Sequence, residues 1–258
     1  MAKSLEELWE AFALTKKYLK QQIEVGWDEL YLTSGGYASG VEDKNKSTET
    51  GSSLTGQAGG VKKIYSVEKQ LHKFYLEIKD CAKCQLSKTR TNFVFGVGSE
   101  ESNVMFIGEA PGKEEDLKGE PFVGAAGKLL NNILEAIKFK RDQVYIANIL
   151  KCRPPENRDP DPEEIGICQP YLLKQIQIIR PGIICALGRI SAQALLKSKL
   201  PLNQLRGRFH DFCVDGLPHP IRFLVTYHPA ALLRYPQYKK QTWEDVQLLR
   251  KEYDRLGV

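Results

Sequence analysis

Two pairs of cysteines have a spacing that suits metal binding: Cys81 with Cys84, and Cys152 with Cys168. A Cys-x-x-Cys segment can turn both of its thiolates toward one metal centre. The second pair is separated by a Pro-rich stretch, whereas a zinc ribbon normally supplies two close pairs. The spacing therefore favours an iron–sulfur cluster over zinc, and the alternative is four unrelated buried thiols.

Three polar residues, Glu109, Asn148 and His228, stand at the ends of apolar, β-rich runs. These runs alternate with helical patterns: strands are predicted over residues 103–108, 143–150, 182–188 and 221–227, and helices near 66–78, 125–138, 162–179, 190–197 and 240–256. Nearly continuous Val, Ile and Leu strands separated by helices predict an α/β fold with a parallel sheet covered on both faces. Ligands of such sheets bind beyond the carboxyl ends of the strands, where these three residues would gather.

The chain is predicted to have three parts. Residues 1–32 form an amphipathic helical extension, because Ser4-Leu5-Glu6-Glu7 is typical of a capping box that opens a helix, here to about Val25. Residues 33–62 have the Gly/Ser/Thr-rich composition of a flexible linker, and residues 63–258 form the main domain. The first helix either docks on this domain or binds a partner protein, and the sequence does not choose between them.

The N-terminus is acidic and has no apolar stretch of the kind that a secretory signal needs. No run of eighteen apolar residues is present, so nothing in the sequence predicts a membrane span. We therefore expect a cytoplasmic, nucleoid-associated prokaryotic protein, a monomer, whose paired cysteines hold metal rather than disulfides. Cys185 and Cys213 lie in apolar stretches, and we interpret them as core or unpaired surface residues.

The positive charge of the chain is unevenly distributed. The net charge is +5, and residues 1–70 contain nine Lys and ten Asp or Glu, so the remaining residues carry +6. A modest basic excess of this kind fits a polyanionic partner such as nucleic acid, although many solvated protein surfaces reach the same value.

Four motifs, together with the four cysteines, resemble a known family. The motifs are GEAPG (108–112), GEPFVGAAGKLL (119–130), ANILKCRPPENRDPDPEE (147–164) and TYHPAALLR (226–234). In this order they resemble the family 4 uracil-DNA glycosylases, the iron–sulfur-containing bacterial and archaeal branch of the uracil-DNA glycosylase superfamily. The resemblance covers roughly residues 66–258 and leaves the N-terminal extension outside it.

This resemblance implies a three-layer α/β/α sandwich with a central four-stranded parallel sheet. It also implies hydrolysis of the N-glycosidic bond of deoxyuridine in DNA, so uracil-containing DNA is the expected partner. The four cysteines match the ligands of the family's [4Fe–4S] cluster. Because glycosidic hydrolysis has no redox step, we expect the cluster to have a structural role.

The resemblance gives Glu109 and His228 the catalytic roles. Glu109 would position or activate the attacking water, a contribution of about 10²–10⁴-fold for a general base. His228 would aim an imidazole N–H at O2 of the departing uracil anion, where loss of one such donor costs on the order of 10²–10³ in rate. Without the motif, either residue is as readily interpreted as a structural or surface residue.

Five residues are expected to bind the extruded base. Asn148 supplies both a donor and an acceptor to uracil, and Phe122 would stack on the ring. Ala110 and Pro111 would offer backbone contacts, and Glu115 matches the position suspected of excluding the thymine methyl group.

The remaining expectations concern DNA. Leu232 would wedge into the base stack after extrusion, and Arg234 would meet a phosphate. The Pro-rich loop would face the DNA backbone through Lys151, Arg153 and Arg158. A second class of function stays open: a non-catalytic iron–sulfur or zinc DNA-binding module, possibly associated with a polymerase. A flavin or dinucleotide enzyme is disfavoured because no Gly-x-Gly-x-x-Gly turn follows a strand.

Overall fold

The computed structural model of the protein describes residues 61–257. The predicted N-terminal helix and residues 33–60 of the predicted linker lie outside the described residues. Helix α2 (Val61–Ile78) begins at Val61, which corrects the predicted start near Ser66. The predicted boundary between linker and main domain, at residues 62 and 63, stays a prediction. The helix extends this far because no Gly or Pro interrupts residues 61–78, whereas Gly60 ends the Gly-rich stretch before it.

The centre of the fold is a six-stranded sheet in the order β1-β3-β2-β4-β6-β5. Its four middle strands are parallel to one another. They are β3 (Tyr145–Asn148), β2 (Val104–Gly108), β4 (Ile183–Leu187) and β6 (Ile221–Thr226). These are the four predicted strands, and almost every residue in them is buried. Strands buried on both faces need apolar residues at every position, which is why the apolar runs predicted them.

Two edge strands were not predicted. Strand β1 (Val97–Gly98) pairs antiparallel with β3, and β5 (Phe209–Phe212) pairs antiparallel with β6. The predicted sheet of four strands is therefore corrected to six. A strand of two residues leaves no readable pattern, and β5 is largely half-buried or exposed, so its sequence is mixed.

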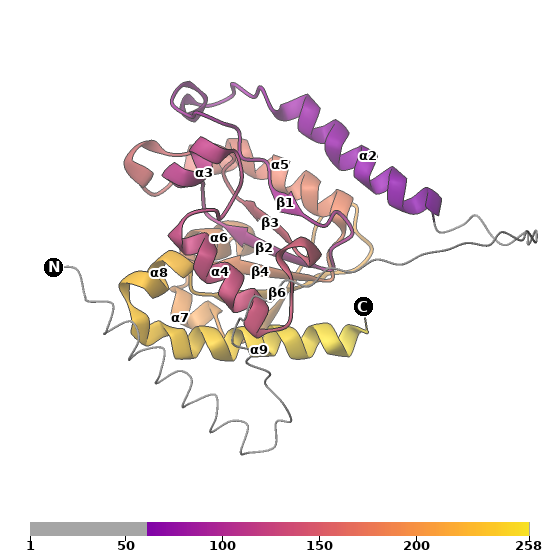
Figure 1. The fold of residues 1–258 in the computed structure, drawn as a ribbon, viewed down its shortest axis with the longest axis vertical. Coiled ribbons are helices and arrows are strands. Elements are labelled where there is room, and N and C mark those ends of the chain that lie inside the picture. Colours follow the sequence, from indigo (N-terminus) through magenta and orange to yellow (C-terminus); the bar gives the residue numbers. More distant parts are fainter. Residues whose placement is uncertain (1–60, 258) are drawn as a thin grey trace, which may run out of the picture. The chain divides into compact units, whose positions relative to one another are not determined.

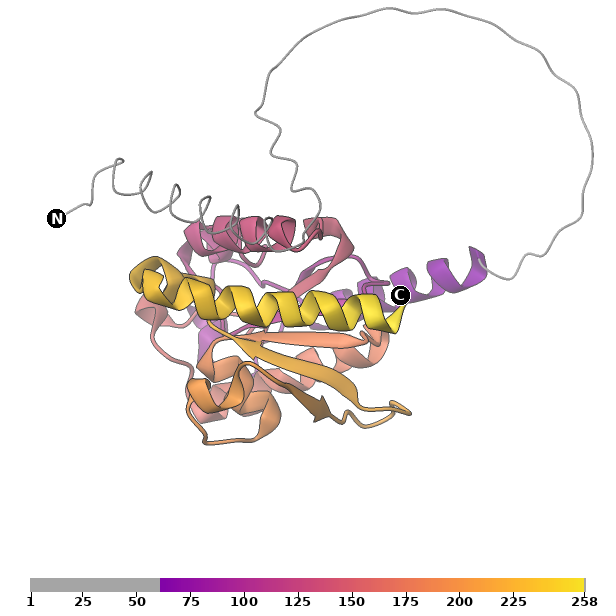
Figure 2. The ribbon, with the colours of Figure 1, turned by 90° about the horizontal axis from the view of Figure 1, so that it is seen from below.

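Helices cover both faces of the sheet (Figures 1 and 2). Helices α2, α5 (Pro162–Ile179) and α6 (Arg189–Leu196) pack on one face, and α4 (Ala125–Ala136) and α9 (Lys239–Leu256) pack on the other. The shorter helices are α3 (Lys113–Lys118), α7 (Leu202–Leu205) and α8 (Pro229–Arg234), with the 3₁₀ turns η1 (Gln85–Lys88), η2 (Arg141–Gln143), η3 (Pro155–Asn157) and η4 (Pro236–Tyr238). This is the predicted α/β/α sandwich.

Strand β2 shows how one sheet holds two cores. Met105 and Ile107 pack toward α2 and α5, whereas Val104 and Phe106 pack toward α4 and α9. Successive side chains of a strand point to opposite faces, so each strand contributes to both layers. Within residues 61–257, no helix combines the length and the apolar character that crossing a membrane requires.

Candidate active site at the carboxyl ends of the strands

Strands β2, β4 and β6 end at one edge of the sheet, where α3, α6 and α8 follow them (Figure 1). Glu109 directly follows β2, and Asn148 is the last residue of β3, paired in register with Gly108. His228 lies two residues beyond the end of β6. The tertiary structure therefore places all three predicted residues at the same edge.

Asn148 has a buried side-chain acceptor with no partner. Asn148 is 2% exposed, and in the described part of the chain no group donates a hydrogen bond to its Oδ1. A buried polar atom without a partner costs free energy, about 1–3 kcal/mol. A buried acceptor without a partner is the expected feature of a site whose ligand supplies the missing donor.

Gly108 opens the space beside this amide. A Cβ atom at position 108 would lie 2.4 Å from Asn148 Oδ1 and 2.7 Å from Phe122 Cζ. Both distances are shorter than any van der Waals contact allows. Gly108 is thus the residue that lets the amide and the Phe122 ring converge.

Phe122 lies between the end of α3 and the start of α4 with a φ of 54°. A non-glycine residue in this left-handed region costs about 1–3 kcal/mol, and such strain concentrates at functional sites. The ring is 5% exposed, and its centroid lies 5.4 Å from that of the His228 imidazole, with the planes tilted by 33°. Arg141 supports the turn by donating from Nη2 to Pro121 O over 2.6 Å.

Glu115 fixes the other side of this turn. Its Oε1 accepts hydrogen bonds of 2.9 Å from the backbone N–H groups of both Val123 and Gly124. The carboxylate therefore shapes the segment that follows Phe122. Glu115 is predicted to exclude the thymine methyl group. Because its carboxylate is bonded to the backbone, it would do so by fixing the shape of this turn.

His228 is held as a neutral imidazole. Its Nδ1 accepts a hydrogen bond of 3.1 Å from the Ala230 N–H, which caps helix α8. Burial lowers the pKa of His228 to about 4, a shift that the Glu115 carboxylate partly opposes. With Nδ1 accepting, the neutral ring carries its proton on Nε2, so this atom is a hydrogen-bond donor across the physiological pH range.

Glu109 is poised to take up a proton. Burial, and then the nearby Asp159 carboxylate, raise the pKa of Glu109 to about 7, while the Arg189 guanidinium opposes them. A general base works best with a pKa near the operating pH. The half-buried carboxylate at this edge therefore has the chemistry that water activation requires.

Arg189 and Asp159 belong to the same edge and were not among the predicted site residues. Arg189 follows Gly188, where an added Cβ would lie 3.0 Å from His228 Cβ, so the start of α6 abuts the imidazole. Arg189 Nη2 lies 2.7 Å from Asp159 Oδ2. Arg189 lies just beyond the end of β4, as Glu109 lies just beyond the end of β2. The strand-end argument could therefore have predicted Arg189 as a site residue.

Comparison with known proteins agrees with this geometry. The Uracil DNA glycosylase superfamily matches residues 95–247. A type-4 uracil-DNA glycosylase of Archaeoglobus fulgidus is 47% identical over 173 residues, 66% of this chain and 86% of that protein. The corresponding protein of Saccharolobus solfataricus is 45% identical over 68% of this chain and 82% of its own length. The chain belongs to the type-4 uracil-DNA glycosylase family. A DNA polymerase of Bacillus phage SP01 is also 31% identical, over only 16% of its length.

The family's predicted wedge residue needs a correction. Leu232 is 1% exposed and lies in the interior, so it is not available at the surface. The neighbouring Leu233 is 49% exposed. The two leucines are adjacent on α8, and the rotation of about 100° per residue carries only one of them outward.

Substitution of the two leucines should separate stability from surface exposure. Leu232→Ala is expected to lower the free energy of unfolding by about 2–5 kcal/mol, because it leaves a cavity in packed surroundings. Leu233→Ala should change it by no more than about 0.5 kcal/mol. Urea denaturation of both variants measures the difference, and equal destabilisation would show that the two side chains are equally buried.

The other predicted contact residues lie around the same edge. Arg234 is exposed at the end of α8, and its positive charge contributes to the low pKa of His228. Ala110 is half-buried and Pro111 is buried in the turn that carries Glu109. Their predicted contacts with the base and with the DNA backbone stay predictions.

Lys151 does not face solvent, which corrects its predicted contact with DNA. It is fully buried, and its Nζ donates to Asn148 O over 3.0 Å and to Gln175 Oε1 over 2.7 Å. Burial lowers the pKa of Lys151 to about 7. Arg158 of the Pro-rich loop is also engaged, because Glu164 accepts hydrogen bonds of 2.7 and 2.9 Å from it.

The four predicted cysteine ligands lie on three segments of the chain. Cys81 and Cys84 follow α2, Cys152 follows β3, and Cys168 lies inside α5. Burial raises the pKa of Cys152, and the Cys84 and Cys81 thiols add to this shift; burial likewise raises the pKa of Cys168, with smaller contributions from Cys152 and Cys84. Cys185 is buried in the core and Cys213 is exposed, in agreement with the sequence interpretation.

Hydrogen-bond donors surround three of these sulfur atoms. Arg90 Nη1 lies 3.1 Å from Cys152 Sγ, the Lys151 N–H donates to Cys168 Sγ over 3.3 Å, and Tyr171 Oη lies 3.2 Å from Cys81 Sγ. Donors of this kind suit thiolates better than thiols. Within residues 61–257, no group of three or more His, Cys, Asp or Glu side chains is arranged to hold a metal ion.

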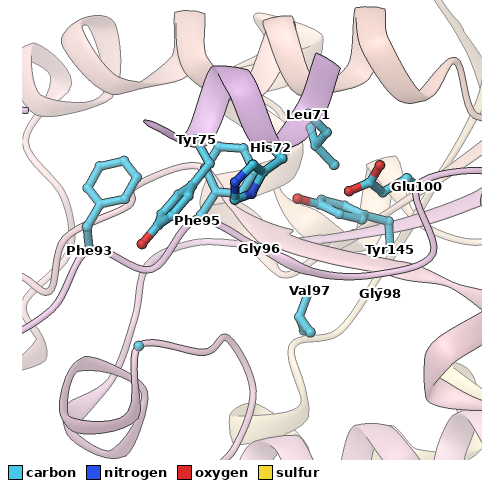
Figure 3. A pocket seen from close by; sticks show the side chains of 11 residues that line it. Leu71, His72, Tyr75, Phe93, Phe95, Gly96, Val97, Gly98, Glu100 and Tyr145 are labelled. Carbon is cyan, nitrogen blue, oxygen red and sulfur yellow. The ribbon is translucent and has the colours of Figure 1, made fainter. Parts of the chain in front are cut away.

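A separate pocket of about 360 Å³ lies beneath α2 along the β1 edge of the sheet (Figure 3). Aromatic side chains dominate its wall, among them Tyr75, Phe93, Phe95 and Tyr145, and Glu100 lies beside the Tyr145 ring. None of the predicted site residues lines it.

Proposed function

We propose that this protein is a uracil-DNA glycosylase acting in DNA repair, which hydrolyses the N-glycosidic bond of deoxyuridine in DNA and leaves an abasic site. Membership of the type-4 family supports the activity. The structural observation that carries the proposal is the buried, unpartnered Oδ1 of Asn148 beside the Phe122 ring and the neutral His228 imidazole.

Uracil supplies what the Asn148 amide lacks. Its N3–H donates to Oδ1, whereas the unprotonated N3 of cytosine is an acceptor and would leave the buried oxygen without a partner. A site built around such a hydrogen bond can discriminate by about 10⁴–10⁵. The Phe122 ring would stack on the extruded base, an interaction worth about 1–3 kcal/mol.

Bond cleavage would use the two groups on either side of the base. As the C1′–N1 bond breaks, its electron pair leaves with the uracil, and His228 Nε2–H donates to the O2 atom where negative charge develops. A water oxygen bonds to C1′ and its proton passes to the Glu109 carboxylate. A neutral imidazole suits this role, because its Nε2–H can donate a hydrogen bond to the uracil anion without any change in the protonation of His228.

Exposed groups beside the site would hold the DNA. Arg234, exposed at the end of α8, would bind a phosphate, and the exposed Leu233, rather than the buried Leu232, would fill the space that the extruded nucleotide leaves. Base extrusion costs a few kcal/mol, which an inserted apolar side chain partly offsets. The N-terminal partner, the monomeric state and the nucleoid association stay predictions.

Uracil release from labelled duplexes containing U·G, U·A, T·G or C·G tests the proposal. Release is expected from both uracil-containing duplexes, with none from T·G or C·G. DNA binding without release of uracil would instead support the non-catalytic module, an alternative that the glycosylase relatives do not favour.

Gly108→Ala should block the pocket without unfolding the protein. The new methyl group pushes the Asn148 amide and the Phe122 ring apart, and a displacement of about 1 Å can lower kcat/KM about 10²-fold. Uracil release under single-turnover conditions measures the loss. Gly166→Ala is the matched control, because nothing lies within 4 Å of a Cβ there. Equal activity of the two variants would contradict the placement of the base.

We also propose that Cys81, Cys84, Cys152 and Cys168 hold a [4Fe–4S] cluster. The four-thiol donor set and the N–H groups directed at the sulfurs support it. The bound cluster would supply structural cross-linking, because hydrolysis involves no electron transfer. It would tie the end of α2 and the Pro-rich loop to α5 behind the Asn148 strand.

Iron and sulfide analysis of anaerobically purified protein tests this assignment. About four of each per chain, with a visible absorption band, are expected for the parent protein. Cys168→Ser should lose the band and lower the melting temperature, whereas Cys213→Ser, at an exposed position, should change neither. One zinc per chain without iron would overturn the proposal.

A further inference from the structure

Arg189 is an exposed cation close to the two candidate catalytic residues. Its backbone follows Gly188, which abuts His228, and its charge opposes the rise in the pKa of Glu109 that burial and Asp159 cause. The side chain is 51% exposed and reaches Asp159 Oδ2 over 2.7 Å. The guanidinium is therefore exposed to solvent close to the candidate active site.

The ion pair with Asp159 is easily displaced. Asp159 is 68% exposed, and water can solvate its carboxylate when Arg189 leaves. The other contact of the guanidinium is a long one of 3.4 Å to Gln193 Oε1. By contrast, Asp245 holds Arg206 from a fully buried position with bonds of 2.7 and 2.9 Å. Exposed ion pairs contribute little to stability, so a stronger anionic ligand can replace Asp159.

A phosphodiester is such a ligand. The planar fork of an arginine matches two phosphate oxygens, and the resulting charge-assisted bonds are among the strongest in proteins. We propose that Arg189 binds the DNA phosphate next to the extruded deoxyuridine, and that it leaves Asp159 to do so. The inference rests on the proposed function, since that function supplies the DNA strand.

A purely structural role of the pair makes a different prediction. The ion pair also joins the Pro-rich loop to α6. If DNA binding depended only on this connection, the loss of Arg189 and the loss of Asp159 would weaken it equally. Competition between Asp159 and phosphate predicts opposite results: loss of Arg189 weakens DNA binding, whereas loss of Asp159 leaves Arg189 free and preserves or strengthens it.

Fluorescence anisotropy with a duplex containing one 2′-fluoro-deoxyuridine, which resists cleavage, separates these roles. Binding is measured over a range of about 50–200 mM salt. Arg189→Gln is expected to weaken binding about tenfold at the low-salt end and to reduce the logarithmic salt slope by about one, the signature of one lost phosphate contact. Arg189→Lys should keep the slope with intermediate affinity. Asp159→Asn should bind as tightly as the parent or several-fold more tightly.

Two control variants make the same charge changes at the opposite end of the sheet. Arg255 is on the last turn of α9, and Asp211 pairs with Arg222 at the start of β6. Arg255→Gln and Asp211→Asn should alter affinity less than twofold. The inference is overturned if Arg189→Gln matches Arg255→Gln, or if both site variants weaken binding equally. Because binding needs no cleavage, a parent protein that binds with this pattern but releases no uracil would contradict only the proposed function.

Discussion

Glu109→Gln is expected to lower kcat by a factor of about 10²–10⁴ and to leave the affinity for uracil-containing DNA nearly unchanged. Glutamine has the shape of glutamate but cannot accept a proton from water. The loss should therefore appear in the chemical step and not in binding. Single-turnover uracil release, together with anisotropy on an uncleavable duplex, measures the two separately.

The pH dependence gives this prediction a second readout. Because burial and Asp159 raise the pKa of Glu109 to about 7, the carboxylate is protonated below that pH and cannot act as a base. In the parent protein kcat/KM should rise with pH, about tenfold per unit, and level off above pH 7. Since His228 has a pKa of about 4, it stays neutral over this range.

Glu114→Gln provides the matched control, since Glu114 is an exposed residue on the neighbouring helix α3. It should retain the parent rate and the parent pH profile. The assignment of Glu109 would be wrong if Glu109→Gln kept a limb near pH 7, or if its rate equalled that of Glu114→Gln.

His228→Ala is expected to lower kcat and kcat/KM together by about 10²–10³, because the lost donor acts on charge that develops only in the transition state. The Nε2–H is oriented by the hydrogen bond that Nδ1 accepts from Ala230. A side chain without a ring nitrogen leaves the O2 atom of the departing base without this donor.

The choice of leaving group sharpens the test of His228. Fluorine at C5 stabilises the departing anion by itself, so the loss caused by His228→Ala should be clearly smaller for 5-fluorouracil than for uracil. His219→Ala, at an exposed position on the β5–β6 connection, should behave as the parent on both bases. An equal loss on both bases would mean that His228 does not contact the leaving group.

The predicted strands and the long helices correspond closely to those in the structure, and helix α5 was predicted with its observed ends. Asp161 caps it, Pro162 occupies its first position, and Glu164 reaches back to the Asp161 N–H over 2.9 Å. These capping interactions join residues within one helical turn of each other, so the local sequence is enough to predict where the helix begins. The edge strands escaped prediction because their pairing depends on neighbours distant in sequence.

The site shows the same division between local and distant effects. Residue type and position after a strand identified Glu109, Asn148 and His228, since the carboxyl ends of parallel strands share an edge. The inference from family resemblance failed for Leu232, because which of two adjacent leucines is buried depends on the rotation of α8 against the domain. Prediction also failed for Lys151, whose charge is taken up by Gln175 and a backbone carbonyl of the interior.

By itself, the sequence determined the order of strands and helices, the family, and the identity of the chemically capable side chains. Only the tertiary structure decided their protonation and pairing: the neutral His228, the proton affinity of Glu109, the unpartnered Asn148 oxygen and the Arg189–Asp159 pair. The reason is that pKa values and buried hydrogen bonds depend on desolvation and on charges brought close by folding. Those distances are properties of the packed chain, and no local pattern of residues encodes them.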